Sequence, residues 1–178
     1  MGTPAAGRVA LMSIHPEYAE RLLDGSKRVE FRKRPLAADV TTVLIYATMP
    51  VGQLVGAFEI DGYDISSPSA VWERHKSHAG ISRSNFRRYF SGRRRAVGIL
   101  VRDARRLDRP LPLSELDDTL RPPQSFRYLE LSPWGGRSVP RPVTADMRKV
   151  VPAATADDLD RLLQRLALAH VAVPGHPS

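Results

Sequence analysis

The chain has 178 residues, a formal net charge of +8 and an isoelectric point near 10.4. It contains no cysteine, which excludes disulfide bonds, thiolate catalysis and cysteine-ligated zinc or iron–sulfur sites. No apolar run approaches the ~20 residues of a membrane-spanning helix, and residues 1–7 lack the apolar stretch of a signal peptide, so we expect a cytoplasmic protein that does not contact membranes.

The N-terminal third predicts a strand, a helix and a second strand. Residues 1–8 are expected to form a disordered leader, and the apolar run 9–13 indicates a buried strand. Pro16 and Glu17 are typical of a first helical turn, and Gly25 of a helix end. Apolar and charged residues then alternate from Ser26 to Lys33, which predicts a half-buried strand.

The middle of the chain predicts three more strands and two helices. Residues 43–47 indicate a strand buried on both faces, and residues 54–60 another, with Gly62 and Asp64 weakening the pattern after it. A helix is expected from Pro68 to His75, and a second one between Ser82 and Gly92. Residues 96–101 predict a strand, and the pattern remains compatible with one as far as Leu107.

The C-terminal part is rich in proline. Residues 121–129 are expected to be stiff and extended, and residues 130–153 to form a linker. A last helix is predicted from Thr155, with an apolar stripe that we expect to pack back on the preceding domain, or else to form a dimer contact. The stripe consists of Leu159, Leu162, Leu163 and Leu166.

The order of these elements predicts an α+β fold. The helices come in two groups instead of following every strand, which argues against a doubly wound sheet and favours a mixed, mostly antiparallel sheet or small β-barrel flanked by helices. We expect one domain over residues 9–130 and a proline-rich linker with a C-terminal helix over 131–178. No glycine-rich phosphate loop of the common kinds is present, and no cofactor is expected.

The strand after Gly25 carries the first candidate site. Its alternation places Arg28, Glu30 and Arg32 on one face, about 7 Å apart in steps of two residues, so that Glu30 is expected between two guanidiniums that keep it ionised. That face is either a ligand-binding site or a solvated surface with an ion pair. Lys27 lies at the corner between helix and strand, where it suits a phosphate contact or, if desolvated, a general base.

Two further groups of polar residues complete the candidate site. Tyr46 lies inside an apolar strand, as a core residue or a site residue. Gln124 and Ser125 precede Phe126 and Tyr128, and aromatic rings beside a basic residue suit base stacking or, alternatively, packing into the body of the domain. His75 and His78 lack the additional ligands of a metal site, and no metal is expected.

The basic residues are unevenly distributed. From Lys76 to Arg102 there is no acidic residue, and the arginines of this stretch are typical of a phosphate-contacting surface or of a solvated one. The arginine-rich composition also agrees with a GC-rich genome. The candidate phosphate contacts are Arg83, Arg87, Arg88, Arg93, Arg94 and Arg95.

Taken together, these segments resemble the ASCH domain, a member of the PUA-like superfamily. The resemblance covers roughly residues 9–130 and rests on Ile14-x-Pro16, Gly25-x-Lys27-x-x-Glu30-x-Arg32, Tyr46-Ala47-Thr48-x-Pro50, Val55-Gly56-x-Phe58 and the ending from Pro122 to Leu129. It implies a small β-barrel with a neighbouring cleft lined by Lys27, and an activity on RNA or modified nucleosides. Some members are ribonucleases and others amidohydrolases of an acetylated cytidine, whose pattern has threonine where this chain has Glu30.

Three functions stay open at this stage. The first is binding of RNA or single-stranded nucleic acid. The second is a metal-independent ribonuclease or another hydrolase of RNA or modified nucleosides, with Lys27, Tyr46 and Ser125 as its catalytic residues. The third is a regulatory module that senses a nucleotide or modified base. In each case the predicted ligand-binding residues are Lys27, Glu30, Arg32, Tyr46, Gln124 and Ser125.

Overall fold

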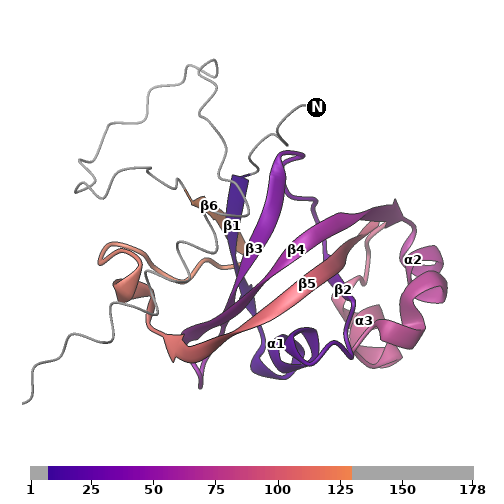
Figure 1. Cartoon of the computed structure of the whole chain (residues 1–178). Coiled ribbons are helices and arrows are strands. Elements are labelled where there is room, and N and C mark those ends of the chain that lie inside the picture. The colour runs from indigo at the N-terminus through magenta and orange to yellow at the C-terminus, as the bar shows by residue number, and fades with distance from the viewer. Residues whose placement is uncertain (1–7, 130–178) are drawn as a thin grey trace, which may run out of the picture.

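The computed structural model describes residues 8–129, and Figure 1 shows how their helices and strands are arranged. The predicted leader, linker and C-terminal helix therefore lie outside the described residues, except for Arg8, which begins the first strand. In chain order the elements are β1 (Arg8–Ile14), α1 (Pro16–Leu23), β2 (Val29–Arg32), β3 (Val40–Ala47), β4 (Gln53–Ser66), α2 (Pro68–His75), η1 (Lys76–His78), α3 (Arg83–Tyr89), β5 (Ala96–Leu111), η2 (Leu113–Glu115) and β6 (Phe126–Leu129).

All six strands belong to one sheet, in the order β2-β5-β4-β3-β1-β6. Only β1 and β3 run parallel, and the other four pairs are antiparallel. The predicted α+β class with a mostly antiparallel sheet is therefore confirmed. The sheet is not closed, however, so the expected barrel describes it only loosely. An edge strand remains on each side, β2 on one and β6 on the other.

The helices begin and end where local sequence signals predict. Pro16 starts α1, and Gly25 follows its end with a φ of 80°, a conformation that favours glycine. The Ser67 hydroxyl accepts a hydrogen bond from the Ala70 N–H at the start of α2, and the Ser82 hydroxyl accepts one from the Asn85 N–H at the start of α3. Among the described residues no helix is long and apolar enough to cross a membrane.

The strands differ from the prediction mainly in length. β4 continues through Gly62 and Asp64 to Ser66, because β5 pairs with it along that whole stretch, with Gly62 opposite Leu100. β5 likewise extends to Leu111. Cross-strand hydrogen bonds thus compensate for the low strand propensity of glycine and aspartate, an effect that the pattern along a single strand does not reveal.

Three apolar clusters form the core of the described domain. The largest fills the space between one face of the sheet and α1, the second covers the opposite face of β1, β3 and β4, and the third joins β2 to α2 and α3. In the third cluster the Phe31 ring meets the Phe86 ring edge-on, with centroids 4.9 Å apart. Figure 1 shows α2 and α3 gathered beside β2, away from β1 and β6.

Candidate functional site

Lys27 precedes β2 and is almost completely buried, with 2% of its surface exposed. Its Nζ donates a hydrogen bond of 2.7 Å to the Ala79 carbonyl and lies 3.5 Å from Glu30 Oε2. The ammonium also lies over the Phe31 ring, 4.7 Å from its centroid. Burial lowers the pKa of Lys27, although the neighbouring Glu30 carboxylate opposes this effect. Lys27 is thus held inside the domain and is not directed into bulk solvent.

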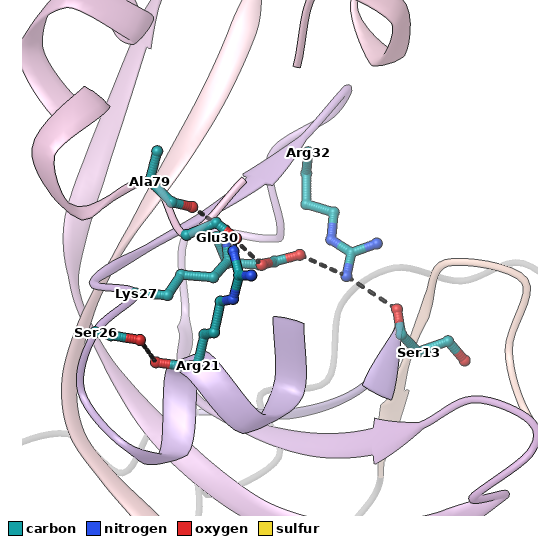
Figure 2. A network of polar contacts seen from close by, with 8 residues as sticks. Ser13, Arg21, Ser26, Lys27, Glu30, Arg32 and Ala79 are labelled. Carbon is teal, nitrogen blue, oxygen red and sulfur yellow. Dashed lines mark hydrogen bonds and ion pairs between the residues drawn. The ribbon is translucent and has the colours of Figure 1, made fainter. Parts of the chain in front are cut away.

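Glu30 lies between two cations, but not between the two that the alternation predicted. Its Oε1 forms an ion pair with Arg32 Nη2 at 2.9 Å, and its Oε2 faces Lys27 (Figure 2). Arg28 is exposed instead, and its Nε approaches the Gly25 carbonyl. Because β2 begins at Val29, the strand alternation does not reach back to residue 28. The burial of Glu30 also rules out a freely solvated face.

Arg32 connects this network to a distant strand. Its Nη2 also donates a hydrogen bond of 3.0 Å to the Ser13 carbonyl near the end of β1 (Figure 2). Since β5, β4 and β3 separate β2 from β1 in the sheet, this contact requires the sheet to curl until its two sides approach each other. Arg32 Nε is buried and has no hydrogen-bond partner among the described residues. One N–H of this guanidinium therefore has no acceptor within residues 8–129.

Ser13, which contacts Arg32, also binds the segment that contains Ser125. The Ser13 N–H donates to the Ser125 carbonyl at 3.0 Å, and the Ser13 hydroxyl donates to the Pro123 carbonyl at 2.6 Å. The N–H and C=O of one strand residue point to the same side, so Arg32 and Ser125 meet the same edge of β1. The side chains of Gln124 and Ser125 are exposed. The structure thus brings Ser125 beside the network, whereas no hydrogen bond to the network involves Gln124 in the described part of the chain.

Tyr46 occupies the neighbouring strand β3, directly opposite Ser13 in the parallel register. Its ring packs in the cluster that contains Leu11 and Leu44, and 6% of the residue is exposed. The Tyr46 hydroxyl makes no hydrogen bond within the described residues, yet it is not among their buried unpartnered polar atoms, which are Arg32 Nε and Tyr63 Oη. The hydroxyl therefore reaches the surface while the ring is buried. Tyr46 lies one strand away from the charged network, without direct contact.

The six candidate phosphate contacts are all exposed, on α3 and on the loop that leads to β5. Among the described residues no ion pair joins any of them to a carboxylate, whereas Arg74, Arg102, Arg106 and Arg109 each pair with an acid. We call Arg83, Arg87, Arg88, Arg93, Arg94 and Arg95 the α3 basic surface. Arg83 interacts with Glu73 at longer range, but none of these arginines forms an ion pair within the described residues.

Tyr89, a residue of the helix expected between Ser82 and Gly92, links the α3 basic surface to the end of β2. The Lys33 ammonium lies 4.7 Å from the centroid of its ring. Burial raises the pKa of the Tyr89 hydroxyl, which is also close enough to Arg32 and Glu30 to sense their charges. Tyr89 and Ser13 are the site residues that the sequence reasoning missed. A tyrosine in an amphipathic helix and a serine at a strand end carry no distinctive local signal.

The fold and the site define an α+β domain with a curled, open sheet, whose edges meet at a buried charged network flanked by two hydroxyl-bearing residues. A family model described as ASCH domain matches residues 12–108. The chain is also 35% identical, over 124 residues, to an "ASCH domain-containing ribonuclease" of Zymomonas mobilis subsp. mobilis, covering 67% of this chain and 83% of the relative. The chain therefore belongs to the ASCH domain family.

Solved structures agree with this assignment. A crystal structure of the ASCH protein of Zymomonas mobilis superposes with a TM-score of 0.64 at 34% identity, covering 68% of this chain and 87% of that one. Two variants of the Zymomonas protein are similar as well, one with a tyrosine replaced by phenylalanine (TM-score 0.63, 33% identity) and one with a serine replaced by alanine (TM-score 0.64, 33% identity). They cover 68% of this chain and 90% and 88% of their own chains.

Proposed function

We propose that this protein binds single-stranded RNA, with the nucleic-acid backbone on the α3 basic surface and one phosphate beside Arg32. The observation that carries this proposal is the group of six exposed arginines that have no acidic partner in the described chain, next to a strand whose own arginine has an unsatisfied edge. A polyanion supplies the missing counter-charge. The choice of RNA rests on the relative that is named a ribonuclease.

Within this proposal Lys27 acts through Glu30. Its ammonium already contacts the Ala79 carbonyl and Glu30, and it is 2% exposed. Lys27 and Glu30 are therefore positioning residues that hold the Arg32 guanidinium at the edge of β1, while Arg32, Ser125 and Tyr46 face the ligand. Gln124 contributes an exposed amide on the same segment as Ser125.

Measuring RNA affinity at several salt concentrations tests the phosphate contacts. Replacing Arg87 and Arg88 with glutamine should flatten the plot of log K against log salt by about 1.4, since each contact with a single strand contributes about 0.7. The matched control replaces Arg102 and Arg106 with glutamine, which changes the net charge equally at arginines that already have acidic partners. Equal slopes for both variants would make the α3 basic surface a solvated surface only, and equal affinity for DNA would remove the preference for RNA.

RNA cleavage is a second candidate function, favoured by the surface-reaching hydroxyl of Tyr46 and by the exposed Ser125, two residues that lie on either side of Ser13. The relative is named a ribonuclease, and its crystallised variants alter one tyrosine and one serine. In this reaction the 2′-oxygen attacks the phosphorus and its proton passes to water. The bond to the 5′-oxygen breaks, Tyr46 donates a proton to that oxygen and recovers one from solvent, and Ser125 hydrogen-bonds the phosphate. The products are a 2′,3′-cyclic phosphate and a 5′-hydroxyl.

Analysis of the RNA ends after incubation, with and without a chelator, tests this second function. Tyr46→Phe and Ser125→Ala should each lower the cleavage rate by about 10²-fold or more without weakening RNA binding comparably. Ser114→Ala, at another exposed serine, should cleave as the parent does. RNA that is bound but remains intact with the parent protein would leave binding as the function, and cleavage that the chelator abolishes would contradict the metal-independent reaction.

A further inference from the structure

The turn between β3 and β4 presents an unusual apolar surface. Met49 is 75% exposed and Val51 39%, and they are two of the four exposed large hydrophobic residues in the described part of the chain. Pro50 lies between them, and the whole turn from Thr48 to Gly52 carries no charge. Single exposed apolar residues are ordinary, but this turn places two of them together with a proline. We call Met49, Pro50 and Val51 the apolar turn.

This apolar turn lies beside the hydroxyl of Tyr46. Gly52 has a φ of 62°, and the point where a Cβ atom would stand on it is 3.0 Å from Met49 Sδ and 3.7 Å from Tyr46 Oη. The bare glycine therefore lies between the thioether and the phenol, and a Cβ here would press on the thioether while reaching ordinary contact distance of the phenol oxygen. The glycine thus leaves the apolar turn and the surface-reaching hydroxyl of Tyr46 next to each other, with no side chain of residue 52 between them.

The chemistry of this surface favours a nucleobase. An uncharged thioether and aliphatic groups offer nothing to a phosphate, whereas a planar, polarisable base packs well on a flexible methionine. A phosphate next to Tyr46 carries a nucleoside with it, whose base extends away from the charged backbone. We infer that the apolar turn receives an unpaired nucleobase of the bound RNA. This inference rests on the proposed function. It adds that the protein contacts bases of the RNA as well as its phosphates.

The test compares two RNA strands on the full chain. One is a fluorescein-labelled uridine 12-mer, and the other is the same sugar–phosphate strand with its internal bases removed. Replacing both Met49 and Val51 with alanine should weaken binding of the uridine strand about three- to tenfold, and should change the affinity for the base-free strand less than twofold. Ile65→Ala is the matched control, an exposed apolar residue at the far end of β4, and it should leave both affinities unchanged.

Three results would overturn the inference. The first is an equal loss of affinity for both strands, which would mean that the turn supports the backbone site only. The second is no loss for either strand. The third is a parent dimer that the double variant disperses while uridine binding stays intact, which would make the turn a protein contact. If the parent protein binds neither strand in a salt-dependent manner, the proposed RNA function itself fails, and this outcome is distinct from the other three.

Discussion

At the scale of single residues, the Glu30 carboxylate forms ion pairs with two buried cations. Lys27 and Arg32 both contact its carboxylate, and all three side chains are nearly excluded from solvent. Moving charges from water into a protein costs free energy that only close pairing and hydrogen bonds offset. Removing one member therefore leaves its partners uncompensated, and the network as a whole is more sensitive to substitution than an ion pair on the surface.

Replacing Glu30 with glutamine should lower the free energy of unfolding by about 3–5 kcal/mol, because two buried cations then face a neutral amide. Urea unfolding followed by circular dichroism measures the change. Glu17→Gln is the matched control, since Glu17 pairs with Arg21 at an exposed i,i+4 position of α1 and should change stability by only about 0.5 kcal/mol. Similar effects of the two substitutions would show that Glu30 behaves as a surface residue.

At the scale of secondary-structure elements, one cation from α1 and one from the segment before β2 hydrogen-bond to the loop before α3. Arg21 Nη1 donates to the Gly80 carbonyl at 2.8 Å, and Lys27 Nζ donates to the neighbouring Ala79 carbonyl at 2.7 Å. Gly80 itself has a φ of 59°, and a Cβ atom there would stand 2.6 Å from Lys27 Cβ. The loop fits over the lysine only because residue 80 lacks a side chain.

Gly80→Ala should therefore destabilise the domain more than backbone strain alone explains. Gly92→Ala provides the comparison, because Gly92 has a similar φ of 71° but nothing within 4 Å of its Cβ position. We expect a loss of about 1 kcal/mol at Gly92 and at least twice as much at Gly80, where the lysine must also move. Melting temperatures of the two variants measure the difference, and equal shifts would contradict the close fit.

At the scale of the whole molecule, the contact between Arg32 and the Ser13 carbonyl joins the two sides of an open sheet. Ser13 also binds the segment 123–125 through its N–H and its hydroxyl, so β2 and the segment before β6 both contact β1 at this residue. A guanidinium suits this position, because its Nη2 stands at the end of a long planar group and contacts a carboxylate and a carbonyl together, whereas an ammonium is a compact point charge. We therefore expect the curl of the sheet to depend on an arginine at this position.

Arg32→Lys should retain the positive charge but weaken the contact between β2 and the β1–β6 side of the sheet. Amide hydrogen exchange should accelerate at least tenfold in peptides covering β1 and β6, and stay nearly unchanged in the β3–β4 pair. Arg102→Lys is the control, because that exposed arginine contacts Glu59 without joining the two sides of the sheet. Unchanged exchange in β1 and β6 would show that the sheet keeps its curl without the Arg32 contact.

Contacts of the site were predictable when the two partners are close together along the chain, and were not when they are far apart. Glu30 and Arg32 were expected to meet, because two strand residues that are two apart share a face. The choice of Arg28 as the second cation was wrong, since β2 begins at Val29 and the preceding turn places Lys27 there instead. The barrel was an overstatement for a related reason: the closure of a sheet depends on its curl, which no single strand encodes.

The amino-acid sequence by itself determined the elements, the α+β class and the family, because prolines, caps, glycines and hydrophobic periods act within a few residues. Only the tertiary structure decided that Arg32 reaches Ser13, that Lys27 is enclosed by the loop at Ala79, and that the hydroxyl of Tyr46 emerges beside Gly52. The first two of these contacts join residues that are 19 and 52 positions apart. These contacts exist because the sheet curls. The long strands β4 and β5 curve with it, so that β2, with α2 and α3 packed on it, lies close to β1.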